Sequence, residues 1–136
     1  MPHLHANGID LYYEWHGPEA GEVVILNNGI FMSAGSWAFQ IPDLKKRYRV
    51  LAWDMRGQGQ SEHPDAEYSM ALHADDLAAL MDALNIPAAH MVGTSYGGSV
   101  SLIMGLRHPA RTRSVLALCS IAKSDALSAA MFERWR

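Results

Sequence analysis

The sequence predicts an α/β fold, in which helices flank a mostly parallel β-sheet. Short runs of apolar and β-branched residues recur along the chain, as expected for strands that are buried on both faces. Segments with helical spacing of apolar residues separate these runs. Strands and helices alternate in order, which is the pattern of crossover connections between parallel strands.

The predicted strands begin with a hairpin. Asn7 and Gly8 tolerate positive φ, so they suit a two-residue turn between strands at residues 3–6 and 9–15. Ligands of parallel sheets bind beyond the carboxyl ends of the strands, so residues that directly follow a strand are the first candidates for chemistry. Four later apolar runs are predicted to be strands: residues 22–26, 49–53, 89–92 and 114–118.

Helices are predicted between these strands. Ser69 is the expected N-cap of a helix that runs to about Asn85, and the aspartates of this helix, Asp76 among them, are expected to lie off its apolar face. A second helix is expected over residues 96–107, where a His-Pro pair ends it. A third is expected to begin near Ser124.

Composition excludes several classes of protein. The 136 residues include 11 Lys and Arg against 14 Asp and Glu, so a strongly basic nucleic-acid binder is not expected. The single cysteine cannot form an internal disulfide, which favours a reducing compartment. The sequence shows no signal peptide and no apolar run of membrane-spanning length. We therefore expect a soluble, cytoplasmic protein with neither a nucleic-acid nor a membrane partner.

A nucleophile motif follows one of these strands. Residues 93–98, Gly-Thr-Ser-Tyr-Gly-Gly, stand between a predicted strand and a predicted helix, which is the context that Gly-x-Ser-x-Gly requires. Ser95 is expected in a strained turn with its hydroxyl exposed, and side chains at Gly93 or Gly97 would collide with the backbone. The free amides of the helix N-terminus favour an oxyanion beside Ser95. The alternative is a glycine-rich corner with an incidental serine.

With this motif the sequence resembles the α/β-hydrolase fold family over essentially its whole length. Residues 27–31, Asn-Asn-Gly-Ile-Phe, stand where that family usually has His-Gly-x-x, and residues 54–61 match its Asp-x-Arg-Gly-x-Gly-x-Ser loop. The resemblance implies that the backbone N–H groups of Ile30 and Tyr96 form the oxyanion hole. Asn28 replaces the usual histidine, as in enol-lactonases of aromatic-acid breakdown and in some acyltransferases.

Other residues near these motifs have competing interpretations. Asp54 and Arg56 can bond to the backbone or to each other, which explains both as structural and makes a catalytic Asp54 unnecessary. The asparagine-glycine stretch can also be a plain strand-to-loop turn. Phe31, beside the expected oxyanion loop, and Trp37 are candidates for substrate contact. Packing against the first helix is an equal alternative for Trp37.

A serine nucleophile needs a base, and the base needs an orienting carboxylate. In the family that this sequence resembles, the acid and the histidine follow the serine. The only histidine after Ser95 is His108, at the far end of the intervening helix and about 18 Å away. His63 is a remote candidate for a dyad with Ser95. Asp125 is a candidate acid, although a helix cap explains it better.

We therefore expect residues 1–136 to be the N-terminal portion of a single α/β-hydrolase domain, truncated after the sixth strand, with a cap beginning near residue 124. The strand at residues 114–118 would then form an exposed apolar edge. Such an edge can pair with a complementing C-terminal segment or with another copy of the chain.

The sequence suggests no cofactor and no metal. His3 and His5 alternate onto one strand face without further ligands, and Cys119 is expected to be a buried apolar residue. The resemblance implies a serine hydrolase that acts on a small carboxylic ester or lactone through an acyl-enzyme at Ser95. The alternatives are an acyltransferase of the same fold and a non-catalytic remnant or interaction module.

Overall fold

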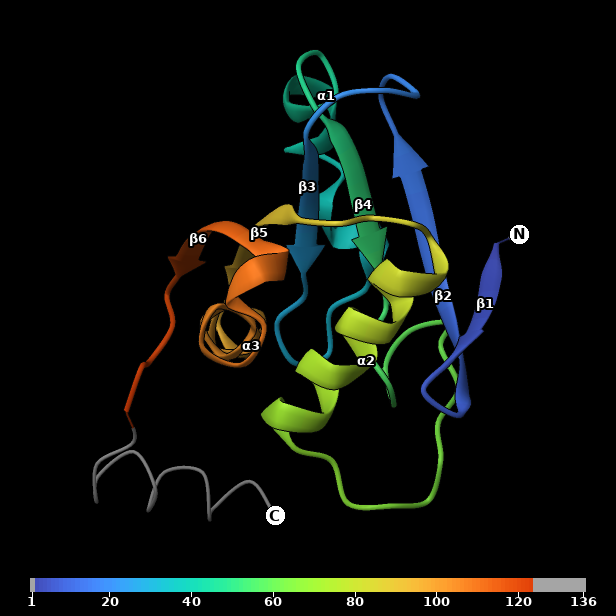
Figure 1. Ribbon diagram of the computed structural model, residues 1–136. Helices are drawn as coiled ribbons and strands as arrows, with labels where there is room; N and C mark the ends of the chain where they lie inside the picture. Colours follow the sequence, from blue (N-terminus) through green and yellow to red (C-terminus); the bar gives the residue numbers. More distant parts are fainter. Residues whose placement is uncertain (1, 124–136) are drawn as a thin grey trace.

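The computed structural model describes residues 2–123, and the helix expected near Ser124 lies outside them. A six-stranded sheet has the strand order β1-β2-β4-β3-β5-β6 (Figure 1). The strands are β1 (His3–Ala6), β2 (Ile9–His16), β3 (Val23–Asn27), β4 (Arg49–Trp53), β5 (Ala89–Thr94) and β6 (Thr112–Leu118). The helices are η1 (Ala34–Trp37), α1 (Ile41–Leu44), α2 (Met70–Ala83), α3 (Tyr96–Arg107) and η2 (Pro109–Arg111).

The sheet is mostly parallel, which confirms the predicted fold class. Strands β4, β3, β5 and β6 pair in parallel, whereas β1 and β2 form an antiparallel hairpin and β2 joins β4 antiparallel. Asn7 and Gly8 have φ of 49° and 78°, as the predicted hairpin turn requires. The carboxyl ends of the four parallel strands therefore meet at one edge of the sheet.

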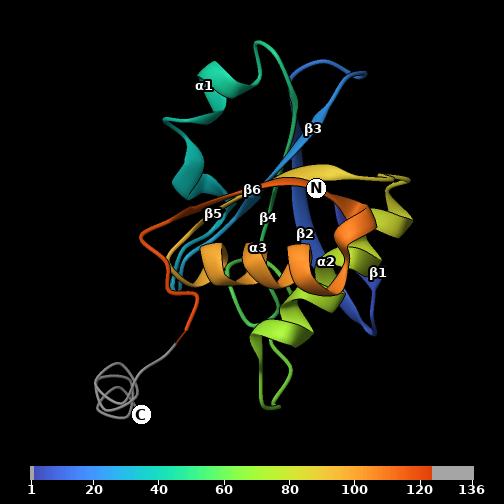
Figure 2. The ribbon, with the colours of Figure 1, turned by 60° about the vertical axis from the view of Figure 1, so that its left-hand side comes forward.

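Two apolar cores lie on opposite faces of the sheet. Helices α2 and α3 cover one face, and η1 and α1 cover the other (Figure 2). The larger core lies under α2 and α3 and contains the fully buried Trp53 of β4. The smaller core includes Trp37 of η1 together with inward side chains of β2, β3 and β4. Both faces of the central strands are thus buried, which explains their continuous apolar sequences.

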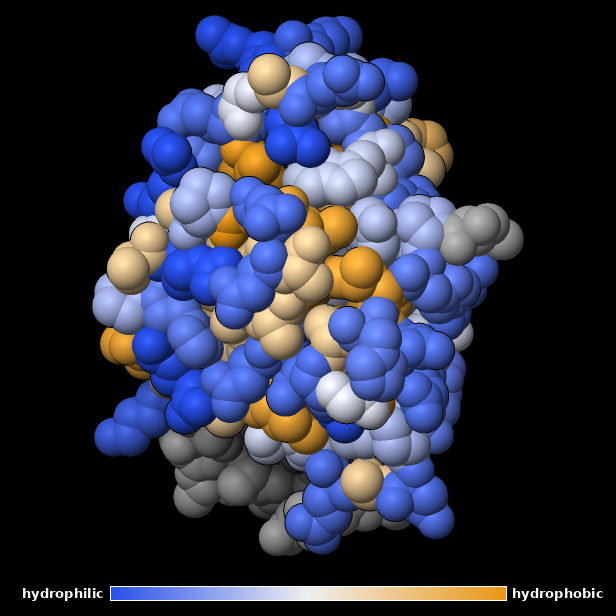
Figure 3. All heavy atoms as spheres, turned by 45° about the vertical axis from the view of Figure 1, so that its right-hand side comes forward, coloured by the Kyte–Doolittle hydropathy of each residue, from blue (hydrophilic) through white to orange (hydrophobic). Residues whose placement is uncertain are grey.

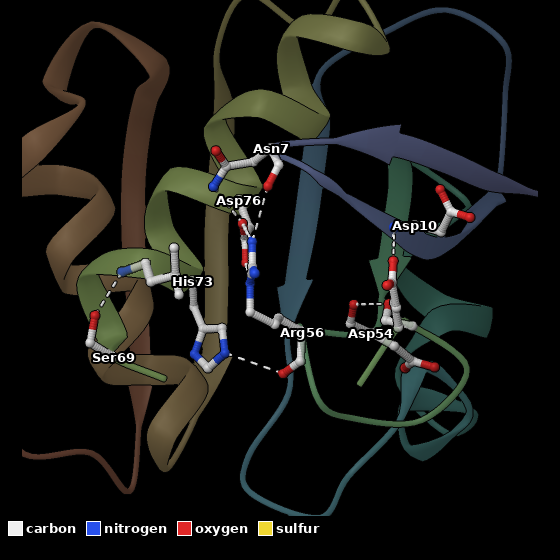
Figure 4. A network of polar contacts seen from close by, with 10 residues as sticks. Asn7, Asp10, Asp54, Arg56, Ser69, His73 and Asp76 are labelled. Carbon is white, nitrogen blue, oxygen red and sulfur yellow. Dashed lines mark hydrogen bonds and ion pairs between the residues drawn. The ribbon is translucent and has the colours of Figure 1, made fainter. Parts of the chain in front are cut away.

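Helix α2 corrects one expectation. Ser69 caps it as predicted, since its hydroxyl accepts a hydrogen bond of 3.0 Å from the Leu72 amide. Asp76, however, is fully buried instead of lying off the packed face. It is buried because Arg56 neutralises it through two hydrogen bonds, from Nε to Oδ2 at 2.9 Å and from Nη2 to Oδ1 at 2.7 Å (Figure 4).

Apolar atoms reach the surface at both sides of the sheet. On the side of the β1–β2 hairpin, hydrophobic atoms gather mainly in the middle of the view, with hydrophilic side chains around them (Figure 3). At the other side, β6 is the last strand of the sheet in the described chain, and its Leu116 and Leu118 are 53% and 41% exposed. Leu116 and Leu118 are therefore exposed as predicted for this strand, whereas Val115 is half-buried against the larger core. None of the helices within residues 2–123 is long and apolar enough to cross a bilayer.

Candidate active site

Ser95 occupies a strained turn between β5 and α3. Its φ of 51° and ψ of −121° lie outside the regions that L-residues usually adopt, at a cost of about 1–3 kcal/mol. Hydrogen bonds to the Ser95 backbone hold the turn. The Ser95 amide donates to Leu118 O at 2.8 Å, and Ser95 O accepts from the Gly98 amide at 3.0 Å, the Ser99 amide at 3.3 Å and the Ser120 hydroxyl at 2.7 Å. The Ser95 side chain is exposed, as the motif predicts.

The glycines of the motif permit a close approach of backbones. A Cβ atom at Gly93 would collide with the backbone of Gly97, and a Cβ atom at Gly97 would collide with the carbonyl groups of Asn27 and Asn28. Helix α3 therefore packs directly against the end of β3. This contact brings the N-terminus of α3 beside the loop that follows β3.

Ile30 and Tyr96, whose backbone amides are the expected oxyanion donors, both lie near Ser95. Ile30 belongs to a turn in which the Met32 amide donates to Gly29 O at 3.2 Å. The Tyr96 amide lies in the first turn of α3, where a helix offers it no acceptor. Ile30 and Tyr96 line one hollow of about 300 Å³ together with Ser95, Met70, Ser99, Cys119 and Ile121.

Cys119 departs from its expected place. It is exposed instead of buried, because it follows the edge strand β6 and adopts a φ of 51°, which turns the chain away from the sheet. The sequence pattern of an apolar strand end gave no sign of this turn.

The structure separates the two candidate substrate contacts. Phe31 is 96% exposed in the loop that follows β3, with a φ of 61°. Trp37 is buried in the smaller core, and its Nε1 donates to Asn28 Oδ1 at 2.7 Å. Of the two interpretations of Trp37, the structure therefore favours packing. Asn28 is itself fully buried and donates from Nδ2 to Trp53 O at 2.9 Å.

Asp54 is buried and bonded to backbone amides. Its Oδ1 accepts from the Ala34 amide at 2.6 Å, and its Oδ2 accepts from the Gln60 amide at 2.8 Å. These contacts agree with the interpretation of Asp54 as a structural residue of the loop after β4. The sequence offered Asp54 or the backbone as partners of Arg56. In the structure the main partner of Arg56 is Asp76 (Figure 4).

Sequence reasoning missed a contact between His73 and Tyr96. His73 of α2 is buried, with Nδ1 2.8 Å from the Tyr96 hydroxyl and Nε2 3.3 Å from Arg56 O. A carbonyl can only accept, so Nε2 carries the proton and the Tyr96 hydroxyl donates to Nδ1. Burial lowers the pKa of His73 and raises the pKa of Tyr96 to about 12. Helical spacing places His73 on the packed face of α2, but its partner comes from another element.

The histidines named from the sequence do not approach Ser95. His108 caps the far end of α3, as expected, with Nε2 3.1 Å from Asp75 Oδ1. His63 is exposed and lines a different hollow, with Phe31. Asp125 lies outside the described residues. Within residues 2–123, no three His, Cys, Asp or Glu side chains gather as they would around a metal ion.

Comparisons with known proteins give a consistent picture. Residues 22–135 match the family model described as "alpha/beta hydrolase fold". "Putative carbamate hydrolase RutD" of Variovorax paradoxus is 40% identical over 125 residues, covering 90% of this chain and 47% of that protein. "3-oxoadipate enol-lactonase 1" of Acinetobacter baylyi is 35% identical over 116 residues, covering 85% and 43%. The chain spans about half the length of the curated relatives it matches.

Solved structures of hydrolases also resemble the chain. A hydrolase from Pseudomonas aeruginosa superposes with a TM-score of 0.88 at 34% identity, over 98% of this chain and 50% of the other. The enol-lactonase from Burkholderia xenovorans superposes with a TM-score of 0.80 at 34% identity, over 82% of this chain and 44% of the other.

Proposed function

The chain belongs to the alpha/beta hydrolase fold family, and on that premise we propose that Ser95 is the nucleophile of a serine hydrolase. Its hydroxyl oxygen attacks the carbonyl carbon of a small carboxylic ester or lactone and forms an acyl-enzyme. The observation that carries this proposal is the strained, exposed Ser95 between β5 and α3, at the carboxyl edge of the parallel strands. The surrounding contacts maintain the strain, and strained residues of this kind concentrate at functional sites.

The Ile30 and Tyr96 amides are the proposed oxyanion hole. Both residues line the hollow that contains Ser95, and the Tyr96 amide also lies at the positive end of the α3 dipole. Each donor of this kind stabilises the transition state by about 3 kcal/mol in comparable sites. Attack by Ser95 places negative charge on the former carbonyl oxygen, and these two N–H groups would receive it.

The proton of the Ser95 hydroxyl needs a base that residues 2–123 do not place beside it. We assign this role to a histidine and an acid outside the described residues. The histidine would accept the Ser95 proton during attack and return it to the leaving alkoxide. Water would then attack the acyl-enzyme through the same histidine, which releases the carboxylic acid and regenerates Ser95.

The hollow beside Ser95 and the relatives support the proposed substrate class. Ile30, Met70 and Ile121 give the hollow beside Ser95 an apolar lining, and its volume of about 300 Å³ suits a small acyl group. The two relatives are named for a carbamate and an enol-lactone, and both substrates have a carbonyl carbon bonded to a heteroatom. Phe31, exposed in the loop that follows β3, is proposed to contact the substrate.

Labelling with a fluorophosphonate tests the nucleophile. The probe would react with the chain in buffer containing imidazole as a substitute base, and peptide mapping would locate the adduct. Ser95 should label faster than the exposed Ser36 and than Ser114, whose Oγ lies 2.7 Å from His90 Nδ1. Ser114 is a strict comparison because it has a histidine neighbour but stands within a regular strand.

The outcomes of this labelling are distinct. A Ser95→Ala variant should lose the fast adduct and keep the slow background. Equal labelling of Ser95 and the two comparison serines would contradict the proposal and favour a non-catalytic interaction module. Once labelling has succeeded, competition between water and an added alcohol or thiol for the acyl-enzyme would separate hydrolysis from acyl transfer.

A further inference from the structure

Residues 29–32 carry the proposed Ile30 donor and are called the oxyanion loop below. The Gln58 side chain bridges the two ends of this loop. Gln58 is half-buried in the loop after β4, and the backbone oxygens of Gly29 and Met32 face its amide. Carbonyl oxygens only accept, so the Gln58 NH₂ group takes the position that bonds both, with Nε2 3.2 Å from each oxygen. One planar amide therefore connects the loop after β4 to the loop after β3.

This bridge bears directly on the Ile30 amide. The Gly29 carbonyl and the Ile30 N–H belong to one planar, trans peptide unit, so they point in opposite directions. A hydrogen bond that fixes the Gly29 oxygen on one side of the peptide unit therefore also fixes the direction of the Ile30 N–H, which points to the opposite side. The unit also lies against the nucleophile turn, since a Cβ atom at Gly29 would be 3.4 Å from Thr94 O and 3.5 Å from Ser95 Cβ.

The oxyanion loop needs an external support of this kind. Phe31 occupies the left-handed region with a φ of 61°, which is unfavourable for a bulky residue, and its side chain is exposed and contributes little packing. Within the turn itself, the Gly29 oxygen accepts only from the Met32 amide at 3.2 Å. The Tyr96 amide, in contrast, is fixed by the hydrogen-bonded helix α3. The two donors are thus held by different means.

From these contacts we infer that Gln58 is a positioning residue that orients the Ile30 N–H for the oxyanion. The inference rests on the proposed function. Gln58 lies on the far side of the peptide unit from the reacting oxygen and acts only through the Gly29 and Met32 carbonyl groups. Its removal should therefore weaken the Ile30 donor and leave the Tyr96 donor intact.

The test uses the phosphonyl adduct of Ser95, whose tetrahedral oxygen stands in for the oxyanion. In the wild-type chain, ¹H–¹⁵N spectra should show the Ile30 and Tyr96 amide protons moving downfield when the adduct forms. In Gln58→Met, which keeps the length but cannot donate, the Ile30 shift should be lost and the Tyr96 shift kept. Labelling of Ser95 should slow about 10-fold, less than the ~100-fold or greater loss seen when a donor is removed outright.

Two further variants complete the design. Gln58→Glu presents a carboxylate to two carbonyl oxygens and should reproduce the effects of Gln58→Met. If the glutamate variant does not fold, the Gln58→Met variant alone tests the inference. Gln60→Met alters a neighbouring exposed glutamine of the same loop and should match the wild type. If both amides shift fully in Gln58→Met, the inference is wrong and the proposed function stands. If neither amide shifts in the wild type, the oxyanion hole itself is wrong.

Discussion

Arg56 and Asp76 form a buried ion pair with two hydrogen bonds, which joins the loop after β4 to helix α2 (Figure 4). The Asp76 carboxylate is fully buried, and the Arg56 side chain is 10% exposed. Arg56 also donates from Nη2 to Asn7 O at 3.1 Å, and Asn7 Nδ2 donates to Asp76 Oδ1 at 2.7 Å. The pair thus connects the N-terminal hairpin, the loop that carries Gln58, and the helix that carries His73.

Replacing one member of this pair should destabilise the fold strongly. In Asp76→Asn, the Arg56 guanidinium would remain buried without its counter-charge, and we expect a loss of about 3–5 kcal/mol in the free energy of unfolding. Urea denaturation measures it. The control is Asp82→Asn, because Asp82 pairs with Arg111 at the surface and is 70% exposed, so its loss should be at most about 1 kcal/mol. Equal effects for the two variants would show that the buried pair contributes no more than a surface pair.

Two glycines of α3 should respond to alanine in opposite ways. In Gly97→Ala, the new Cβ would strike the carbonyl groups of Asn27 and Asn28, so β3 and α3 must separate and stability must fall. In Gly105→Ala, the Cβ would make an ordinary contact of 3.5 Å with Val115 Cγ2, and the better helix propensity of alanine should add up to about 1 kcal/mol. Thermal unfolding of the pair tests this, and similar melting temperatures would contradict the close approach.

The sequence predicted best those features that depend on local pattern. The hairpin turn, the four parallel strands, the Ser69 cap and the strained serine turn all follow from a few adjacent residue types. β5 extends two residues beyond its predicted end, and β6 begins two residues early, because apolarity marks the buried centre of a strand and not its hydrogen-bonded limits.

The errors and omissions share a different cause. The burial of Asp76, which helical periodicity did not predict, depends on Arg56, which lies 20 residues earlier in the chain. The packing of Trp37, which the sequence left as one of two alternatives, depends on the amide of Asn28. The position of His73 beside Tyr96 depends on the packing of helix α2 against helix α3. The position of Gln58 beside Gly29 depends on the loops after β4 and β3 meeting at one edge of the sheet. Helical or strand periodicity carries no information about such partners.

The exposed edge should make the chain self-associate. β6 has no neighbour beyond it in the described sheet, and Leu116 and Leu118 are exposed on it. Size-exclusion chromatography over a range of concentrations should show an apparent mass that rises with concentration. A double variant, Leu116→Lys with Leu118→Lys, should be monomeric. Leu106→Lys removes an exposed leucine from α3 instead, and should leave the association unchanged; if it abolishes association equally, the edge is not the contact.

The stability of the chain should fall on mild acidification because of His73. Burial lowers the pKa of His73 below its ordinary 6.5, so the unfolded state binds more protons than the folded state between the two values. The contribution of neutral His73 is therefore complete above pH 6.5 and is lost as the pH falls through the depressed folded value. Below that value both states are protonated and the loss levels off.

The groups around His73 set the size of this loss. The Arg56 charge disfavours protonation, whereas the Asp76 charge and the hydrogen bond to Arg56 O favour it, and the Tyr96 hydroxyl occupies Nδ1 as a donor. Protonation would turn Nδ1 into a donor facing that hydroxyl, which must then reverse its own hydrogen bond.

Urea midpoints measured between about pH 8 and pH 5 test this prediction while the carboxylates stay largely ionised. The urea concentration at the unfolding midpoint of the wild type should decrease as the pH is lowered. His73→Gln should be less stable overall but should show a flatter dependence on pH. His63→Gln, at an exposed position, should keep the slope of the wild type. A slope that survives in His73→Gln would assign the acid sensitivity to another group.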